Sequence, residues 1–392
     1  MANVNDYLTW RGDLKISTAH PFNDVDGMIL ARFSYLVFNK IALESRETVG
    51  SIAEKMSKLK NSEFRWNGDK QMITLMGQSR RFRKMRVTDF MEEHDETAEK
   101  QFAAITIHID YHEVYISFLG TDETIVGWKE DFNMAFLEKV PAQEDGLKYF
   151  QMIVKKYPLR RFRLGGHSKG GNVAIYTAIM LSDRWQKRLI KVYNFDGPGL
   201  SKRLMAKDLG WSVLPKIQSF IPQDSVVGRL LEHAEDYEVV KSSAKSLYQH
   251  DIFSWQVSRT GLVPSTLTEE SNTINTAITR WLENATLEQR RIFVDGLFKI
   301  LTEGKAKRVD EIMKNWPKYI PAFIKSFSGI SKEERKVILD SLKELSGSYV
   351  KVKRRKAKKK AEEKKKIEEK KEQEKIKKSK SKTEKRASSK KI

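Results

Sequence analysis

The chain has 392 residues, of which 40% are hydrophobic, so it can bury a core larger than that of one small domain. It contains no cysteine, which excludes disulfides, Cys-ligated zinc and a thiol nucleophile. A chain without cysteine fits a reducing compartment, and neither a secretory signal nor an apolar run of about 18 residues is visible. We therefore expect a cytoplasmic protein, with membrane contact only from the periphery.

The net charge of +21 is concentrated at the C-terminal end. Residues 351–392 carry 22 Lys and Arg against seven Asp and Glu, and they contain no aromatic residue. Such a segment cannot offset its ordering entropy by packing, so we expect it to be disordered or a single charged helix. It can attract polyanions or an anionic membrane without sequence readout, or simply keep the chain soluble. A smaller basic cluster, at residues 80–86, is predicted to be a solvated loop or helix face.

Residues 1–262 alternate between helical and strand patterns. An early amphipathic helix is predicted after Asn23-Asp24, because Val25, Ile29, Phe33 and Leu36 recur at helical spacing. Residues 103–109 and 114–119 predict a β-hairpin. Further strands are predicted at 163–165, 190–195, 216–221 and 237–240, and further helices at 145–157 and 171–181. This alternation predicts an α/β fold with a mainly parallel sheet and an antiparallel leading edge.

Residues 266–350 are predicted to be entirely helical. Thr286 with Gln289, and Ser331 with Glu334, fit capping boxes at two helix starts. Gly304 and Gly347 are candidate helix stops. No catalytic constellation is visible there, so we interpret this segment as a packing or lid-like appendage. The predicted domains are thus 1–262, the helical appendage at 266–350 and the tail at 351–392.

A G-x-S-x-G motif, formed by Gly166, Ser168 and Gly170, lies between a predicted strand and a predicted helix. A serine at the apex of such a turn takes up strained backbone angles, and residues two positions away must lack side chains to avoid collision. The turn exposes the serine hydroxyl beside a backbone N–H. His167 is expected to pack beside the turn. The alternative interpretation is a glycine-rich structural turn.

The sequence Gly-His-Ser-x-Gly-Gly resembles the nucleophile elbow of class 3 lipases, the fungal-lipase-like branch of the α/β-hydrolases. Residues 117–121, with Gly127-Trp128 and Asp131-Phe132, are similar to the oxyanion strand and Trp–Asp segment of that family, and residues 192–199 resemble its next strand and turn. The Gly-His-Ser-Lys-Gly-Gly variant, together with residues 7–13, resembles a bacterial branch. The resemblance covers residues 1 to about 260 and implies an α/β-hydrolase fold and an acyl ester or lipid substrate.

A serine nucleophile needs a histidine base and an orienting acid, which follow it in this fold in the order acid, then histidine. Asp224 is our choice of acid, because it follows a predicted strand and matches the family's Asp-x-Val segment. A turn-capping role for Asp224 stays open, and Asp196 is the alternative acid. For the base we prefer His250, which falls where a loop is expected, over His233.

The resemblance implies an oxyanion hole formed by the N–H groups of Lys169 and Thr121, with the Thr121 hydroxyl as a further donor. Lys169 replaces the aliphatic residue usual in the family. Its ammonium group needs a partner, either Asp122, Asp131 or Asp196, or else an anionic group of the substrate; we favour the ion pair.

The sequence therefore predicts a serine hydrolase with a Ser168–His250–Asp224 triad and an acyl-enzyme intermediate. No zinc, P-loop or dinucleotide motif is visible, so no cofactor is implied. The alternative is a binding or scaffold protein that keeps the fold without turnover and uses its cationic tail.

Overall fold

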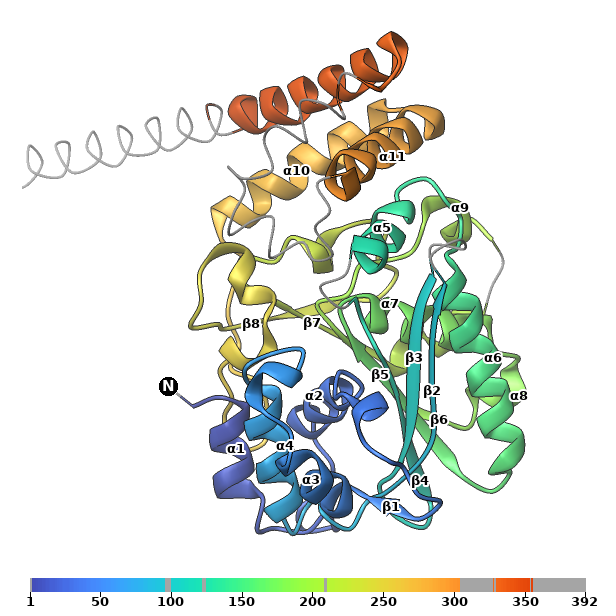
Figure 1. Cartoon of the computed structure of the whole chain (residues 1–392), viewed down its shortest axis with the longest axis vertical. Coiled ribbons are helices and arrows are strands. Elements are labelled where there is room, and N and C mark those ends of the chain that lie inside the picture. Colours follow the sequence, from blue (N-terminus) through green and yellow to red (C-terminus); the bar gives the residue numbers. More distant parts are fainter. Residues whose placement is uncertain are drawn as a thin grey trace, which may run out of the picture.

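The computed structural model describes residues 2–95, 100–121, 125–207, 210–303, 327, 329–352 and 354. These residues form an eight-stranded sheet whose spatial order follows the chain order (Figure 1). The strands are β1 (Glu47–Thr48), β2 (Arg86–Asp95), β3 (Lys100–His108), β4 (Glu113–Phe118), β5 (Arg161–His167), β6 (Leu189–Phe195), β7 (Ile217–Pro222) and β8 (Tyr237–Val240). Neighbours from β1 to β4 are antiparallel and neighbours from β4 to β8 are parallel. The predicted α/β fold and its antiparallel hairpin are confirmed.

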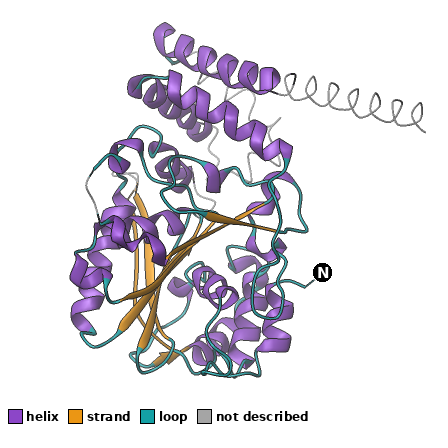
Figure 2. Ribbon diagram, turned by 180° about the vertical axis from the view of Figure 1, so that it is seen from behind, coloured by secondary structure: helices purple, strands orange, loops and turns teal. Residues whose placement is uncertain are grey.

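Helices cover both faces of the sheet (Figures 1 and 2). The longer helices of this part are α1 (Val4–Arg11), α2 (Asp24–Phe33), α3 (Val49–Ser57), α4 (Asp69–Gln78), α5 (Ile125–Asn133), α6 (Pro141–Lys156) and α7 (Lys169–Met180), and the one-turn helices are α8 (Asp183–Gln186) and α9 (Lys202–Met205). Helices α1 to α4 share one hydrophobic core with one face of the sheet. Helices α6 and α7 share a second core with the other face.

Strand β4 shows how the sequence builds these two cores. Successive side chains of a strand point to opposite faces of the sheet. Val114, Ile116 and Phe118 accordingly belong to the core under α6 and α7, whereas Tyr115 belongs to the core under α2 and donates a hydrogen bond to the carbonyl oxygen of Gly27 over 2.8 Å. A strand buried on both faces is mostly apolar, as the predicted run at 114–119 is; its one hydroxyl without an aromatic ring, on Ser117, donates a hydrogen bond to the Ala31 carbonyl oxygen over 3.1 Å.

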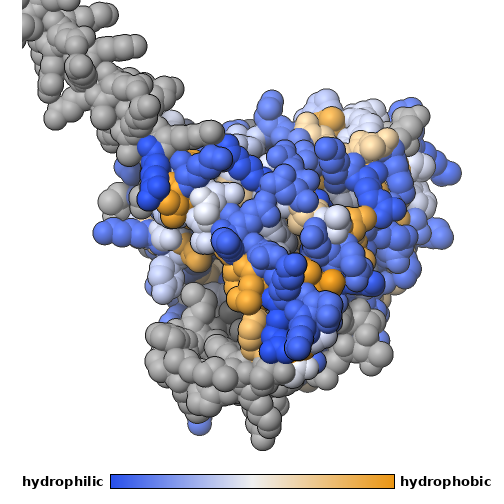
Figure 3. Space-filling view, turned by 90° about the horizontal axis from the view of Figure 1, so that it is seen from above, coloured by the Kyte–Doolittle hydropathy of each residue, from blue (hydrophilic) through white to orange (hydrophobic). Residues whose placement is uncertain are grey.

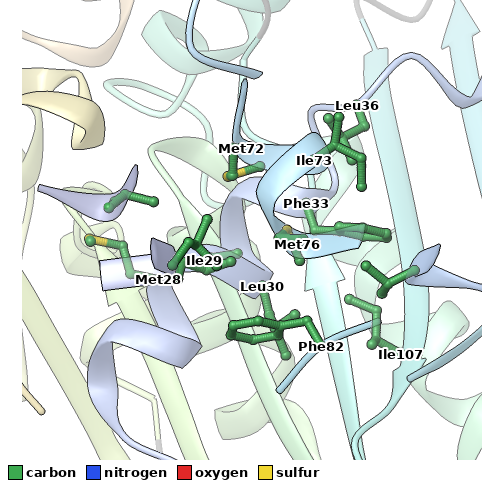
Figure 4. Close-up of a cluster of buried hydrophobic side chains, with 14 of the residues drawn as sticks. Met28, Ile29, Leu30, Phe33, Leu36, Met72, Ile73, Met76, Phe82 and Ile107 are labelled. Atoms are coloured by element: carbon green, nitrogen blue, oxygen red, sulfur yellow. The ribbon is translucent and has the colours of Figure 1, made fainter. Parts of the chain in front are cut away.

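Helix α2 lies at the centre of the first core (Figure 4). Asn23 caps its N-terminus in a capping box with Asp26, which confirms the helix predicted after Asn23-Asp24. Met28, Ile29 and Leu30 are fully buried, so this short helix contributes apolar contacts all round.

A buried ion pair joins α2 to the basic cluster at residues 80–86. The side chains of Arg81 and Asp26 are both 0% exposed and form an ion pair, and Arg81 Nε donates to Asp26 Oδ1 over 2.6 Å. Tyr7 Oη donates to the same carboxylate oxygen over 2.9 Å. The prediction of a solvated cluster is therefore wrong for Arg81, although Arg80 is exposed as predicted. A pattern of adjacent cations does not reveal that one of them has a buried carboxylate as its partner.

The C-terminal part contains α10 (Glu269–Asn284), α11 (Leu287–Glu303) and a further helix over residues 332–352. The capping boxes Thr286–Gln289 and Ser331–Glu334 are confirmed. The predicted stop at Gly347 is wrong: the helix continues through it, because an interior glycine costs only about 1 kcal/mol relative to alanine and does not end a helix by itself. Gly304 lies outside the described residues.

Helix α11 packs against α5. Lys129 Nζ lies 3.1 Å from Asp295 Oδ1, and the rings of Phe132 and Phe298 have centroids 5.4 Å apart. The domain boundaries at 262, 266 and 350 stay a prediction, and most of the tail lies outside the described residues. Among the helices of the described part, none combines the length and the apolar character needed to cross a membrane.

Replacing Arg81 by Ala is expected to leave the Asp26 carboxylate buried without its cation. We expect the free energy of unfolding to fall by about 3–5 kcal/mol, measured by urea denaturation followed by circular dichroism. Arg80→Ala is the control, because its side chain is exposed, and should change stability by less than about 0.5 kcal/mol. Equal losses in the two variants would show that the ion pair contributes nothing specific.

Candidate active site

Ser168 lies at the turn from β5 into α7 and has φ 56° and ψ −132°, in the positive-φ region that a residue with a side chain seldom occupies. Such a conformation costs about 1–3 kcal/mol and persists only where the surroundings enforce it. Here the Ser168 N–H donates to the Phe195 carbonyl oxygen of the neighbouring strand β6 over 2.9 Å. The serine is thereby fixed at the carboxyl edge of the sheet, with 6% of its surface exposed.

The two glycines of the motif make this turn possible. A Cβ on Gly166 would lie less than 3.0 Å from the backbone of Gly170, and a Cβ on Gly170 would lie equally close to the carbonyl oxygen of Phe118. Contacts this short with the backbone cannot be relieved by rotating a side chain. The G-x-S-x-G spacing therefore reflects a real steric requirement of the turn at Ser168.

Asp196 and His250 meet next to this turn. Asp196 directly follows β6 and also has a positive φ, of 53°. Its Oδ2 lies 2.6 Å from His250 Nδ1, and its Oδ1 accepts hydrogen bonds from Ser225 Oγ over 2.5 Å and from the Gly228 N–H over 3.1 Å. A carboxylate only accepts hydrogen bonds, so His250 carries a proton on Nδ1, and in the neutral ring the lone pair is on Nε2.

The sequence prediction named Asp224 as the partner of His250, but in the structure Asp224 does not contact the His250 ring. Its Oδ2 accepts from the Ser246 N–H over 2.9 Å and from Gln249 Nε2 over 2.8 Å, while its Oδ1 accepts from Thr268 Oγ1 over 2.5 Å. Asp224 thus holds the short helix η5 (Ser246–His250) in place from outside. The physical reason is the sheet order: Asp224 follows β7, one strand further from β5 than β6 is.

The alternative base, His233, lies elsewhere. Its Nδ1 is 3.1 Å from Glu235 Oε1, and Glu235 also accepts from Ser219 Oγ over 2.7 Å. His250, in contrast, lies against the elbow: its ring centroid is 4.5 Å from that of His167. Among the described residues, Ser168 Oγ makes no hydrogen bond to His250. Hydrogen bonds between a nucleophile and its base are often long in proteins without bound substrate.

His167 has a contact that sequence reasoning missed. Its Nε2 donates to the His250 carbonyl oxygen over 2.7 Å, so its Nδ1 is unprotonated and accepts from Tyr35 Oη over 3.2 Å. Burial, with the nearby His250 and Arg32, lowers the pKa of His167 well below its usual value and keeps the ring neutral. The residue before Ser168 thus orients the backbone of His250. In the sequence, the only signal for this role was the position of His167 inside the motif.

The loop with Thr121 touches the elbow from the side of β4. A Cβ on Gly120 would lie within 3.0 Å of the His167 carbonyl oxygen and 3.2 Å from Ser168 Cβ. Thr121 is 8% exposed, and its hydroxyl donates to Asp131 Oδ2. Burial raises the pKa of Asp131 to about 6. The loop that ends in the predicted oxyanion residue Thr121 therefore lies next to Ser168, the residue that precedes the other predicted oxyanion residue, Lys169.

The Lys169 side chain is fully buried and forms an ion pair, as predicted, but with a different partner. Its Nζ lies 2.5 Å from Glu130 Oε2, and both side chains are 0% exposed. Of the three predicted partners, Asp131 and Asp196 have the partners given above, and Asp122 lies outside the described residues. A buried ammonium group paired in this way does not face a substrate.

The chain was compared with a family model and with solved structures. The Mbeg1-like family model matches residues 76–299. Among solved structures, a variant of MDLA from Penicillium cyclopium is 14% identical with a TM-score of 0.37, over 66% of this chain and 92% of that one. Lipase II from Rhizopus niveus is 14% identical with a TM-score of 0.30, over 44% of this chain and 70% of that one.

The lipase of Rhizomucor miehei, solved with its propeptide, is 17% identical with a TM-score of 0.29, over 40% of this chain and 57% of that one. No curated protein sequence matches the chain. The family model spans more than half of the residues. The chain therefore belongs to the Mbeg1-like family.

Proposed function

We propose that this lipase-like hydrolase is a serine esterase that acts on acyl esters or lipids through Ser168, His250 and Asp196. The observation that supports the proposal best is the 2.6 Å contact between His250 Nδ1 and Asp196 Oδ2, next to a serine in a strained turn. A carboxylate so placed fixes the tautomer of the imidazole and stabilises the imidazolium that forms when the ring takes a proton.

In the proposed reaction, His250 Nε2 takes the proton of Ser168 Oγ while that oxygen attacks the acyl carbon. The carbonyl oxygen becomes negative and accepts hydrogen bonds from the N–H groups of Lys169 and Thr121. The tetrahedral intermediate then expels the alcohol, which takes the proton from His250, and the acyl group stays on Ser168. Water repeats the sequence with His250 as base, releasing the carboxylic acid and restoring the serine.

Two apolar side chains beside the base support an acyl substrate. Leu247 and Tyr248 lie three and two residues before His250 in η5 and are 55% and 79% exposed. Exposed apolar side chains next to a reacting centre offer contact for a hydrocarbon chain.

Labelling with a fluorophosphonate probe tests the nucleophile. We expect the wild-type protein to be labelled on Ser168 and to hydrolyse p-nitrophenyl esters, because the probe reacts with an activated serine. Ser168→Ala should abolish both labelling and hydrolysis, and the exposed Ser258→Ala serves as control. Labelling that persists in Ser168→Ala would place the nucleophile elsewhere.

Substitution of the two aspartates distinguishes the candidate acids. Asp196→Asn should lower kcat by about 10⁴-fold, because the neutral amide no longer stabilises the imidazolium or selects its tautomer. Asp224→Asn should cost less than about tenfold, since it weakens hydrogen bonds that hold η5 but leaves the Asp196–His250 contact intact. Steady-state hydrolysis of a p-nitrophenyl ester measures both, and the reverse ranking would make Asp224 the acid after all.

For the tail, we propose contact with an anionic membrane surface, in keeping with a cytoplasmic, membrane-peripheral location. The proposal is supported by the helix at 332–352 that leads into it, where Leu339, Leu342 and Val350 are about half exposed at helical spacing. Figure 3 looks onto this end of the molecule, which is mostly hydrophilic with small separate apolar patches. Exposed apolar residues next to Lys and Arg fit a lipid surface better than a nucleic acid.

Sedimentation with vesicles tests this contact. The full chain should bind vesicles that contain phosphatidylserine at low salt, lose binding as salt is raised, and ignore pure phosphatidylcholine. Equal binding to both vesicle types, or to neither, would contradict the proposal. Binding by a chain that the fluorophosphonate probe does not label would favour the second candidate function, a binding protein without turnover.

A further inference from the structure

The ion pair between Lys169 and Glu130 is unusual because it is buried and adjoins the nucleophile. Besides Glu130, Lys169 Nζ has the carbonyl oxygen of Gln101 as an acceptor, at 3.0 Å. The Glu130 carboxylate also accepts from the N–H groups of Gln101 over 3.1 Å and of Ala142 over 3.0 Å. The pair is therefore tied to the start of β3 and to the start of α6 as well as to α7.

Burying two charges is a poor way to gain stability. The desolvation cost of a buried pair often exceeds its Coulomb attraction, and apolar residues of similar volume are commonly as good or better. An aliphatic side chain at position 169 would fill the same space. The pair thus needs an explanation other than stability, and geometric specificity is the one its position suggests.

The next residue on α5, Asp131, holds the other oxyanion candidate. Its carboxylate accepts from the Thr121 hydroxyl, while that of Glu130 binds Lys169. Consecutive helical residues point about 100° apart, so one turn of α5 can contact both Lys169 and Thr121. Lys169 and Thr121 are the two residues whose N–H groups would donate hydrogen bonds to the oxyanion.

We propose that Glu130 is a positioning residue: through the Lys169 side chain it fixes the first residue of α7, so that the Lys169 and Thr121 N–H groups keep the spacing that a tetrahedral oxyanion requires. This inference rests on the proposed function. Donors of this kind accelerate the reaction only if they are aligned before charge develops. The hydrogen bonds that join the pair to Gln101 and Ala142, and the Asp131–Thr121 contact beside it, provide that alignment.

The test replaces both charges at once. Glu130→Gln alone would leave a buried ammonium group without its counterion and lower the Tm for structural reasons. The double variant Glu130→Gln/Lys169→Met removes both charges of this pair together, and the glutamine can still accept a hydrogen bond from one of the two N–H groups. We expect its Tm to stay within a few degrees of wild type, kcat to fall about tenfold or more, and KM to stay unchanged.

A trifluoromethyl ketone supplies a readout that a purely structural role would not move, because its adduct with the serine places a negative oxygen in the oxyanion hole. Its affinity should fall by the same factor as kcat/KM. The matched control is Glu144→Gln/Lys139→Met, which removes a surface Lys–Glu pair whose side chains are 43% and 50% exposed. That variant should behave as wild type.

The outcomes separate this inference from the proposed function. A double variant with wild-type Tm, kcat and ketone affinity would overturn the positioning role alone. A wild-type protein that neither reacts with fluorophosphonate nor binds the ketone would overturn the proposed function. If the double variant does not fold, Glu130→Asp keeps the charge but shortens the side chain by one methylene, and an unchanged kcat in that folded variant would equally overturn the inference.

Discussion

The positive φ of Ser168 is the constraint around which the rest of the site is arranged. It requires Gly166 and Gly170 to touch backbone that no side chain could approach, and it brings the serine to the same sheet edge as the end of β6. Once the turn is fixed there, a group that follows β6 lies beside it. Asp196 is that group, and its own positive φ turns its carboxylate toward His250.

Features with a local cause could be predicted from the sequence. The glycine spacing around Ser168, the capping boxes at Thr286 and Ser331, and the hairpin before β5 each depend on residues close together in the chain. The choice between Asp196 and Asp224 as the acid does not depend on residues close together in the chain. Both follow strands, and only the spatial order of the sheet decides which strand end lies next to β5. Asp224 matched a family segment, yet here it holds η5 rather than the imidazole.

The partners of buried charges likewise depend on the spatial arrangement of elements that are far apart in the sequence. The sequence indicated that Lys169 needs a counterion, because an ammonium group beside a nucleophile cannot stay unpaired. The sequence could not identify Glu130 as the partner, since this pairing depends on the packing of α5 near the first residue of α7. Arg81 is the parallel case in the other half of the molecule: one of several adjacent cations is buried against Asp26, and nothing in the run of charges distinguishes it.

The proposed acid, Asp196, and the proposed base, His250, are 54 residues apart, and His250 lies in η5, outside the regular sheet. Asp224, Gln249 and Thr268 anchor that segment by side-chain hydrogen bonds, whereas the elbow is held by the ladder between β5 and β6. Segments anchored in this way open at lower free energy than central strands. A local opening that releases η5 would therefore separate the His250 imidazole from Ser168 while the central sheet stays intact. The loss of the proposed active-site geometry and the global unfolding of the chain would then be two separate transitions.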